Sequence, residues 1–466
     1  MFYPSLEEIA KMAESGRYKT APVSMEILSD IKTPIEVLRI LKNISQHCYM
    51  LESISDNEKW GRYTFLGYDP QMEITCTDGK MEVGNDTFIT SDPGKYIKQV
   101  LSERKSASFT GLPTFTGGLV GYFSYDYLKY AEPTLRLDAE DAEGFKDLDL
   151  MLFDKVIAFD NYRQKIVLIV NIFLRDYETE YKRAKKDLRL MSDLICTGQP
   201  QVEKAGKLKS QITALYDQQQ YCDMVDQALR HIKEGHISQI VLSNRLGAKY
   251  EGSLLNTYRL LRTVNPSPYM FYFYSKDMEI AGASPETLIK LEKRTLYTFP
   301  LAGTRPRGQT DEEDKRLERD LLADPKELAE HDMLLDLGRD DLEKVSKPGS
   351  IIVEKYHTVE RYSHVMHIGS TLRADLAEGK DALDAIRAML PAGTLSGSPK
   401  VKSCQLINDI EKKKRGIYGG AIGYLDFTGN LDTCIAIRFA YKKNNKVFVR
   451  SGAGIVADSL PETEYQ

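Results

Sequence analysis

Apolar and polar residues alternate in short runs near the start of the chain, which is the pattern of half-buried strands. These runs cover residues 63–68, 72–77 and 80–83. Asp78 and Gly79, between the last two runs, predict a tight hairpin because both residue types tolerate positive φ. A second strand-rich block covers 150–174. The charged run 175–194 then predicts a helix with one solvated face.

The second part of the chain mixes strands with helices. The polar segment 198–210 has no periodicity and predicts the main boundary, between regions 1–205 and 206–466. Helices are predicted at 218–234, 312–322, 325–342, 381–390 and 399–413. Strands are predicted at 237–246, 269–274, 279–283, 295–299, 351–356 and 362–367, with three more within 418–450. Because no regular strand–helix–strand rhythm appears, we expect an α+β fold with mostly antiparallel sheets.

Composition narrows the class of protein. The chain has 466 residues, 42% of them hydrophobic and 28% charged, as in a soluble globular protein. A net charge of -5 gives no electrostatic reason to expect nucleic acid. No signal peptide or membrane-crossing run is visible. Six scattered cysteines without a Cys-x-x-Cys pair indicate reduced thiols. We therefore expect a cytoplasmic protein with no membrane or nucleic-acid partner.

Two carboxylates share one face of the helix predicted at 325–342. Glu327 and Glu330 are three residues apart, so both can point at one metal ion or proton, or simply at water. Asp324 as N-cap would make Glu327 the third residue of a capping box, and this local reading is the stronger one. Glu330 has no such local role. Further along, a box from Ser459 would explain Glu462 but not Glu464.

A loop of small residues at 391–400 leads into a predicted helix. Ser398 can cap that helix and Pro399 can open it. The helix start and Lys400 favour an anion there, although an ordinary capped loop explains the pattern equally well. Similar glycine-containing strand exits occur at 300–304 and 451–454.

Arg438 and the histidines of the second region are harder to assign. Arg438 lies within an apolar run, 434–440, read as one strand, so it should have a buried anionic partner or a ligand. His364 and His367 flank the predicted strand 362–367. Neither has a ligand partner at metal spacing, and a lone histidine is more often structural.

Ten ordered segments resemble component I, the large subunit of anthranilate synthase, within the chorismate-utilising enzymes. The resemblance runs from about Tyr18 to the last residue. It rests on segments 51–53, 117–123, 239–243, 265–271, 283–286, 300–307, 326–337, 391–400, 416–424 and 452–464. It implies sheets packed as a β-sandwich flanked by helices, with the active site in a cleft between the sheets.

The resemblance also implies the reaction and its residues. Ammonia adds to chorismate and pyruvate is eliminated to give anthranilate, with Mg²⁺ on the ring carboxylate. Glu327, Glu330 and Glu464 fall in the metal region. The implied catalytic residues are Glu286, which protonates the departing hydroxyl, His367 near pyruvate elimination, Gln239 and Lys400. Those implied to hold the ring and carboxylates are Gly303, Thr304, Thr394, Tyr418, Arg438, Gly452, Ala453 and Gly454.

Two positions discriminate among the chorismate-utilising enzymes. Water-using relatives carry a lysine base where this chain has Gln239, and ammonia needs no such base. Aminodeoxychorismate synthases have a nucleophilic lysine where this chain has Ala302. Both residues favour direct amination to anthranilate. The alternatives are an aminodeoxychorismate synthase component I and a catalytically dead tryptophan-sensing subunit.

The resemblance further implies feedback inhibition by tryptophan. Matching positions are Glu52, Ser53, Pro268, Tyr269, Met270, Phe271, Gly423, Tyr424, Asp432 and Cys434. A carboxylate and a hydroxyl suit the ligand's ammonium, while Met and aromatic groups suit indole. Three of these positions can equally be explained as residues of the hydrophobic core: Met270, Phe271 and Cys434.

A partner chain is implied as well. The sequence has no glutaminase nucleophile motif, so glutamine-dependent activity requires a separate amidotransferase subunit, anthranilate synthase component II. The chain stops at Gln466, and the resemblance leads us to expect a C-terminal helix and one more metal-region glutamate beyond Glu464.

Overall fold

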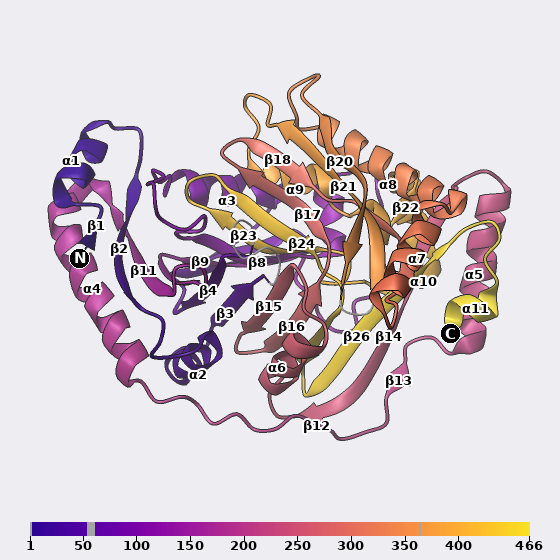
Figure 1. Cartoon of the computed structure of the whole chain (residues 1–466), viewed down its shortest axis with the longest axis horizontal. Coiled ribbons are helices and arrows are strands. Elements are labelled where there is room, and N and C mark those ends of the chain that lie inside the picture. The colour runs from indigo at the N-terminus through magenta and orange to yellow at the C-terminus, as the bar shows by residue number, and fades with distance from the viewer. Residues whose placement is uncertain (1, 54–60, 363–364) are drawn as a thin grey trace.

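Two large antiparallel sheets pack face to face in the computed structural model, which describes residues 2–53, 61–362 and 365–466. Figure 1 shows the sheets in the middle, with α1 and α4 at one end and α5 and α11 at the other. The predicted α+β class with antiparallel sheets is confirmed. Within the described ranges, every pairing between named strands is antiparallel.

Strands from both regions of the chain build each sheet. The first sheet has the spatial order β1 (Phe2–Tyr3), β2 (Thr20–Leu28), β11 (Lys165–Phe173), β10 (Lys155–Asp160), β4 (Tyr63–Tyr68), β3 (Cys48–Glu52), β15 (Tyr269–Tyr274), β16 (Met278–Ser284), β25 (Phe439–Lys443), β26 (Lys446–Ile455), β14 (Gln239–Glu251) and β12 (Lys207–Leu208), with β13 (Thr213–Ala214) and β22 (Gly397–Ser398) also paired to β14. The second has the order β19 (Leu301–Pro306), β21 (Val365–Asp375), β18 (Thr295–Thr298), β17 (Thr287–Glu292), β24 (Leu431–Ile435), β23 (Ala421–Asp426), β8 (Gly118–Phe123), β9 (Leu148–Phe153), β5 (Met72–Thr77), β6 (Lys80–Val83) and β7 (Asp86–Ile89), with β20 (Ile352–Arg361) paired to β21.

Helices cover the outer faces of this sandwich. They are α1 (Leu6–Glu14), α2 (Pro34–Ile44), α3 (Pro93–Ser102), α4 (Tyr177–Thr197), α5 (Gln218–Lys233), α6 (Leu255–Val264), α7 (Asp311–Leu322), α8 (Pro325–Glu343), α9 (Ala382–Met389), α10 (Lys400–Glu411) and α11 (Pro461–Tyr465), with 3-10 turns η1 (Tyr125–Tyr130), η2 (Leu174–Asp176) and η3 (Gly393–Leu395). An apolar core that includes Phe65, Phe153 and Tyr424 fills the space between the sheets. Helices α1, α2, α4 and α6 pack on the first sheet, and α3 and α9 pack on the second.

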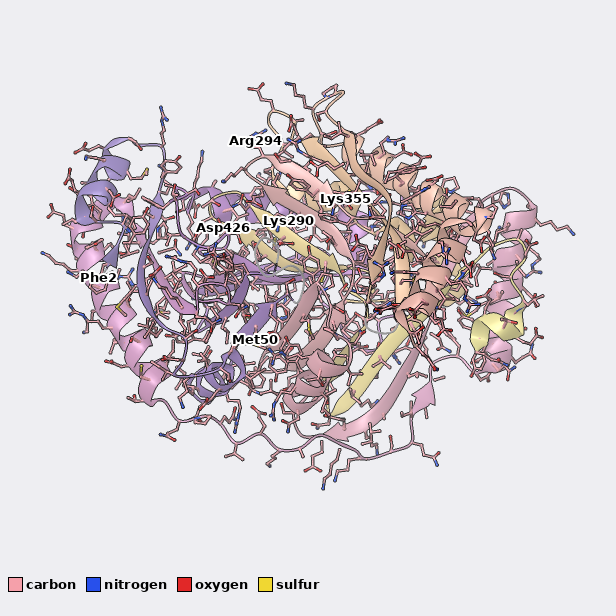
Figure 2. The ribbon with its side chains drawn as sticks, viewed as in Figure 1. Phe2, Met50, Lys290, Arg294, Lys355 and Asp426 are labelled. Atoms are coloured by element: carbon pink, nitrogen blue, oxygen red, sulfur yellow. The ribbon has the colours of Figure 1, made fainter. Side chains whose placement is uncertain are left out.

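Side chains fill this interior densely. In Figure 2, Met50 of β3 lies within the molecule, whereas Phe2 lies at its edge. Met50 is fully buried beneath α2 and beside β15, so the N-terminal region supplies part of the core that the C-terminal region uses.

The local patterns gave most elements correctly. The hairpin at Asp78 and Gly79 is confirmed, with φ of 47° and 81°. Helices α5, α7, α8, α9 and α10 lie within two residues of their predicted bounds. The helices thus formed where periodicity and capping residues agreed.

Several local predictions were wrong. The segments 300–304 and 451–454 are not strand exits, because residues 301–304 begin β19 and residues 451–454 lie within β26. The run 434–440 is not one strand: β24 ends at Ile435 and β25 begins at Phe439, so residues 418–450 hold parts of four strands instead of three. Ser398 does not cap α10, because it belongs to β22 and pairs with Gln239. Ser459 does not cap α11, since its hydroxyl accepts from the Val456 amide.

The segment after α4 runs along one side of the molecule to β12 (Figure 1). Both sheets cross the predicted boundary at 205/206: β3 pairs with β15 in the first sheet, and β8 pairs with β23 in the second. None of the described helices is long and apolar enough to cross a membrane.

Candidate active site

Glu286 lies where the chain passes from one sheet to the other. Its position between β16 and β17 buries the side chain. The Thr394 hydroxyl donates a hydrogen bond to its carboxylate at 3.2 Å. Burial raises the pKa of Glu286 to about 8, and Thr394 and Arg438 offset only part of this effect. The carboxyl is therefore largely protonated at neutral pH and can donate a proton.

Arg438 lies on a second passage between the sheets, directly beside the first. The Ala283 amide donates to the Arg438 carbonyl at 3.1 Å, and the Ile435 amide donates to the Glu286 carbonyl at 3.0 Å. Of the two alternatives for Arg438, the structure does not support an internal anionic partner: the residue is exposed, and within the described ranges it forms no ion pair, which leaves a ligand. Its charge nevertheless opposes the rise in the pKa of Glu286, and it adds to the lowering of the pKa of His367 that burial causes. Arg438 thus offers a free cation to an anionic ligand.

His367, on β21, faces β19 of the same sheet, whereas His364 lies outside the described residues. Its Nδ1 lies 3.0 Å from the Gly303 carbonyl oxygen and 3.1 Å from Thr304 Oγ1. A carbonyl only accepts, so Nδ1 carries the proton and Nε2 is the basic nitrogen. Burial lowers the pKa of His367, which keeps the ring neutral near pH 7. Gly303 has φ of 68° at a bulge in this pairing, and this bulge turns its carbonyl towards the histidine.

A second group of predicted residues lies on β14 and β26. A Cβ built on Gly454 would stand 3.1 Å from Gln239 Nε2, and one on Gly452 would stand 3.0 Å from the Tyr418 hydroxyl oxygen. Glycine at both positions therefore keeps the backbone accessible beside an amide and a phenol. Ala453 lies between them and pairs with Leu242 of β14.

The Glu327 side chain binds Arg305 and does not complete the predicted capping box. Asp324 does cap α8, but the Glu327 carboxylate instead accepts from the Thr304 amide at 3.3 Å and Arg305 Nη1 at 3.1 Å. The sequence offered no signal for this pair, because Arg305 of β19 precedes Glu327 by 22 residues. Glu327 thereby links α8 to the strand that holds Gly303.

Glu330 and Glu464 are placed less tightly. Loss of surrounding water and the nearby Glu327 raise the pKa of Glu330, so a cation would stabilise its charged form. Glu464, on α11, lies near Tyr221 of α5. Within the described part of the chain, the ligand atoms of the three glutamates do not gather within 4.8 Å of one another. Their carboxylate oxygens nonetheless match the donor type that Mg²⁺ prefers.

Lys400 does not offer a free charge to an anion. Its ammonium donates to the Asp341 carboxylate of α8 and to the Met389 carbonyl at 3.3 Å. The Lys400 charge is neutralised inside the protein, and the pair holds the start of α10 against α8.

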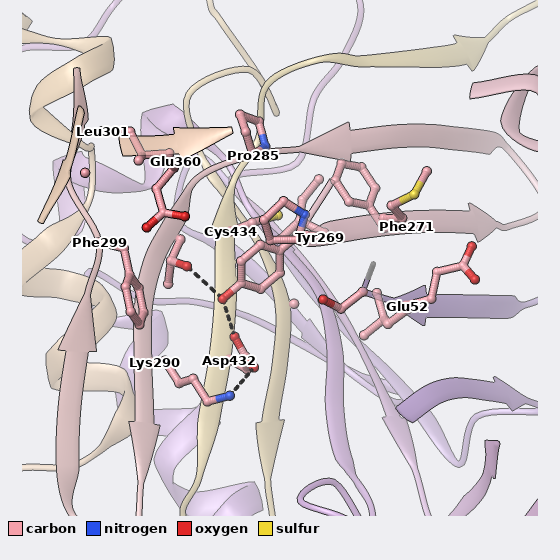
Figure 3. Close-up of a pocket in the computed structure, with 18 of the residues that line it drawn as sticks. Glu52, Tyr269, Phe271, Pro285, Lys290, Phe299, Leu301, Glu360, Asp432 and Cys434 are labelled. Atoms are coloured by element: carbon pink, nitrogen blue, oxygen red, sulfur yellow. Dashed lines mark hydrogen bonds and ion pairs between the residues drawn. The ribbon is translucent and has the colours of Figure 1, made fainter. Parts of the chain in front are cut away.

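A cavity of about 360 Å³ lies between the two sheets, with walls from β3, β15, β17, β23 and β24 (Figure 3). All ten positions that the resemblance assigned to tryptophan line this cavity: Glu52, Ser53, Pro268, Tyr269, Met270, Phe271, Gly423, Tyr424, Asp432 and Cys434. Met270, Phe271 and Cys434 are also core residues, each about 1% exposed. The two readings of these side chains are therefore compatible.

One wall of the cavity carries a row of polar contacts, drawn as dashed lines in Figure 3. Lys290 Nζ lies 3.1 Å from Asp432, whose other oxygen accepts from the Tyr269 hydroxyl at 2.8 Å. Glu52 is engaged in the same way, because Arg262 and the Tyr258 hydroxyl contact its carboxylate. An ammonium group bound here would therefore share either carboxylate with the cation that already pairs with it. Sequence reasoning did not single out Lys290, since its role depends on a strand pairing.

Comparison with known proteins agrees with this architecture. The family described as chorismate binding enzyme matches residues 24–466. The chain is 41% identical to anthranilate synthase component 1 of Acetivibrio thermocellus, covering 100% of this chain and 96% of that protein. It is 43% identical to the Aquifex aeolicus protein of the same name, with coverage of 99% and 94%. The crystal structure of anthranilate synthase component I from Streptococcus pneumoniae superposes with a TM-score of 0.80 at 35% identity, covering 94% of this chain and 96% of that one.

Proposed function

The chain belongs to the family of chorismate-binding enzymes, and we propose that it is the large subunit of an anthranilate synthase, a lyase that makes anthranilate and pyruvate from chorismate and ammonia. The proposal rests on the buried carboxyl of Glu286 beside Thr394, whose pKa is raised to about 8, and on Arg438, which forms no ion pair with any residue that the structure describes. An acid and a free arginine suit a dianionic substrate that must lose a hydroxyl group.

The first step uses Glu286 as the acid. Ammonia forms a bond to C2 of chorismate, the ring double bonds shift, and the C4–oxygen bond breaks. Glu286 donates its proton to the departing oxygen, so water leaves instead of hydroxide. Arg438 binds the enolpyruvyl carboxylate, with Tyr418 and the open backbone of Gly452 and Gly454 beside it.

The second step uses His367 as the base. Its unprotonated Nε2 removes the proton from C2 while the enolpyruvyl carbon–oxygen bond at the ring breaks. The ring becomes aromatic and pyruvate leaves. The Gly303 carbonyl and Thr304 hold the imidazole in the tautomer that this step requires.

We assign the metal region to Mg²⁺. Glu330 and Glu464 would bind the ion directly, and Glu327 would contact it only through a water molecule or another ligand. The ion would neutralise the ring carboxylate of the substrate. Lys400 keeps only the indirect role of fixing α10 against α8, because Asp341 neutralises its charge.

Tryptophan is the proposed inhibitor, bound in the cavity between the sheets. Tyr269, Met270 and Phe271 offer the indole an apolar wall, and Asp432 offers the ammonium a carboxylate. The proposal is supported by the fact that all ten residues assigned to tryptophan line the same cavity.

The assay that tests the function contains chorismate, Mg²⁺ and ammonium at alkaline pH. We expect anthranilate fluorescence and one pyruvate released per anthranilate, measured by mass spectrometry and a coupled assay. A 4-amino product without pyruvate would instead identify an aminodeoxychorismate synthase. The side chain of Ala302 cannot form the covalent adduct that such an enzyme requires.

The partner proposal is a glutamine amidotransferase subunit, component II, which would supply ammonia. We expect co-elution on gel filtration and a gain in glutamine-dependent rate when the two are mixed. Separate elution with no gain in rate would contradict it.

A further inference from the structure

The end of helix α5 carries a geometry that the reaction does not use. Gly235 has φ of 75°, its amide donates to the Ile232 carbonyl at 3.0 Å, and the His236 amide donates to the His231 carbonyl at 2.9 Å. These two bonds form a Schellman motif, which brings the residue after the glycine back over the last turn of the helix. Apolar side chains commonly pack at these two positions. In this chain both are histidines.

The two imidazoles face each other through the same ring atom. His231 Nδ1 and His236 Nδ1 lie 3.0 Å apart, and Glu234 Oε2 lies 3.3 Å from His236 Nδ1 and 4.0 Å from His231 Nδ1. Within residues 2–53, 61–362 and 365–466, this is the one group of three or more potential ligands whose atoms all lie within 4.8 Å. Two of its three members offer an imidazole nitrogen.

These distances are close to those of a bound ion. A tetrahedral ion with bonds of about 2.0–2.1 Å spaces its donors roughly 3.3 Å apart. The 4.0 Å contact has to shorten and the 3.0 Å distance between the two Nδ1 atoms has to lengthen slightly. The Glu234 side chain is 59% exposed, so it can rotate. The backbone hydrogen bonds of the Schellman motif hold the two histidines, so little order has to be created on binding.

Without a metal, the two Nδ1 atoms can share a single proton, one donating and one accepting. A metal ion would replace that proton and use both lone pairs. We propose that His231, Glu234 and His236 form a site for a divalent transition metal of the zinc class, with its fourth position open to solvent. Imidazole nitrogen favours zinc, nickel or copper over magnesium, so this site is distinct from the Mg²⁺ region.

Occupancy of this site would stabilise the corner between α5 and β14. His236 is followed by Ser238, whose amide donates to the Ser398 carbonyl at 2.8 Å, and by Gln239 at the start of β14. The ion would join the end of the helix to this segment. Its binding would therefore raise the thermal unfolding temperature of the whole chain.

Isothermal titration of Zn²⁺ into the full chain, in the presence of excess Mg²⁺, tests the proposal. The background carries Cys196→Ser, because Cys196 is the exposed thiol among the described residues. We expect one Zn²⁺ per chain and a higher unfolding temperature. His231→Gln and His236→Gln should each weaken binding by at least about 10-fold, the loss that even an outer partner of a ligand causes. His47→Gln, which alters a histidine outside the cluster, is the matched control and should bind as the parent does.

Visible absorption of bound Co²⁺ gives a second readout, since its intensity reports tetrahedral nitrogen and oxygen ligation. A tetrahedral spectrum that both histidine variants abolish supports the site. The absence of Zn²⁺ binding below millimolar concentration would overturn it. Stoichiometric binding that survives in both variants would overturn it equally.

Discussion

The surroundings of each glutamate decide what it does in this protein. Glu286 is buried beside a hydroxyl and kept protonated, Glu327 is held by Arg305, and Glu279 is buried among cations. The sequence nominated Glu286 through the resemblance alone, because burial between two sheets depends on contacts far apart in the chain. It also assigned Glu327 to a capping box, since the local pattern could not reveal Arg305.

Replacing Glu286 with Gln should abolish turnover while stabilising the fold at alkaline pH. The folded pKa of Glu286, about 8, is above that of an unfolded glutamate. The folded state therefore holds the extra proton, and stability falls as pH rises from about 4.5 through 8. A glutamine at this position does not ionise, so the variant does not lose stability in this way as the pH rises. We expect no anthranilate fluorescence and a higher unfolding temperature than the parent at pH 8.5, measured by calorimetry. In the parent, kcat should fall above pH 8.

Glu279→Gln is the matched control with the opposite sign. Lys42 and Lys442 contribute to a lowered pKa, so its stabilising charge is present at neutral pH and lost as pH falls through that pKa. Replacing this buried carboxylate with an amide should lower the free energy of unfolding by about 3 kcal/mol at pH 7. Equal effects of the two substitutions on stability at pH 8.5 would contradict the assignment of Glu286 as a neutral acid.

At the scale of elements, the sequence predicted strands and helices well and their ends less well. The apolar run around Arg438 looked continuous because each residue suits a strand. The chain instead leaves one sheet and enters the other there, with Arg438 at φ of 52°. Such a break is a tertiary feature, set by two sheets that meet at this point. The cap at Ser398 failed for a similar reason, since pairing with β14 took precedence.

Arg438→Ala and Arg438→Gly should separate the charge from the backbone conformation. Both remove the guanidinium, and we expect both to lose at least 100-fold in kcat/KM, about 3 kcal/mol for a hydrogen-bonded charge. Glycine suits positive φ, so its variant should be more stable than the alanine variant by about 1 kcal/mol. Steady-state kinetics and denaturant unfolding check the two effects. Retained activity in either variant would remove Arg438 from the mechanism.

Strand β3 ends in the wall of the inter-sheet cavity, where Ser53 lies. Ser53→Ala should raise the inhibition constant of tryptophan about 10-fold, the value of one hydrogen bond to a charged group. The rate without tryptophan should stay within twofold, because Ser53 lies outside the catalytic group. Inhibition kinetics with chorismate as varied substrate measure this. An unchanged inhibition constant would refute the cavity assignment.

At the scale of the whole molecule, the polar stretch after α4 was visible in the sequence, but the sharing of both sheets across it was not. Strand order reflects pairings between residues more than 100 positions apart, such as Met270 with Glu52. Local periodicity carries no information about such partners. Lys42 of α2 is an example of such a long-range contact. Its buried side chain pairs with Glu203 of the segment after α4 and lies near Glu279 of β16.

Lys42→Met should loosen the connecting segment without separating the two regions. Loss of the buried cation leaves Glu203 and Glu279 without their shared partner, at a cost of about 3 kcal/mol. We expect faster trypsin cleavage within 198–210 and a lower unfolding temperature. The two fragments should still co-elute on gel filtration under native conditions, because the sheets hold them. Fragments that elute separately would contradict this account.

The two passages between the sheets, at Glu286 and at Arg438, are hydrogen-bonded to each other side by side. Any slide of one sheet over the other must therefore pull on both connections at once. The side chains of Glu286 and Arg438 lie on these two connections, so the distance between them depends on how the two sheets are aligned. We therefore expect a molecule bound between the sheets to change this distance, and with it the activity, without contacting either side chain.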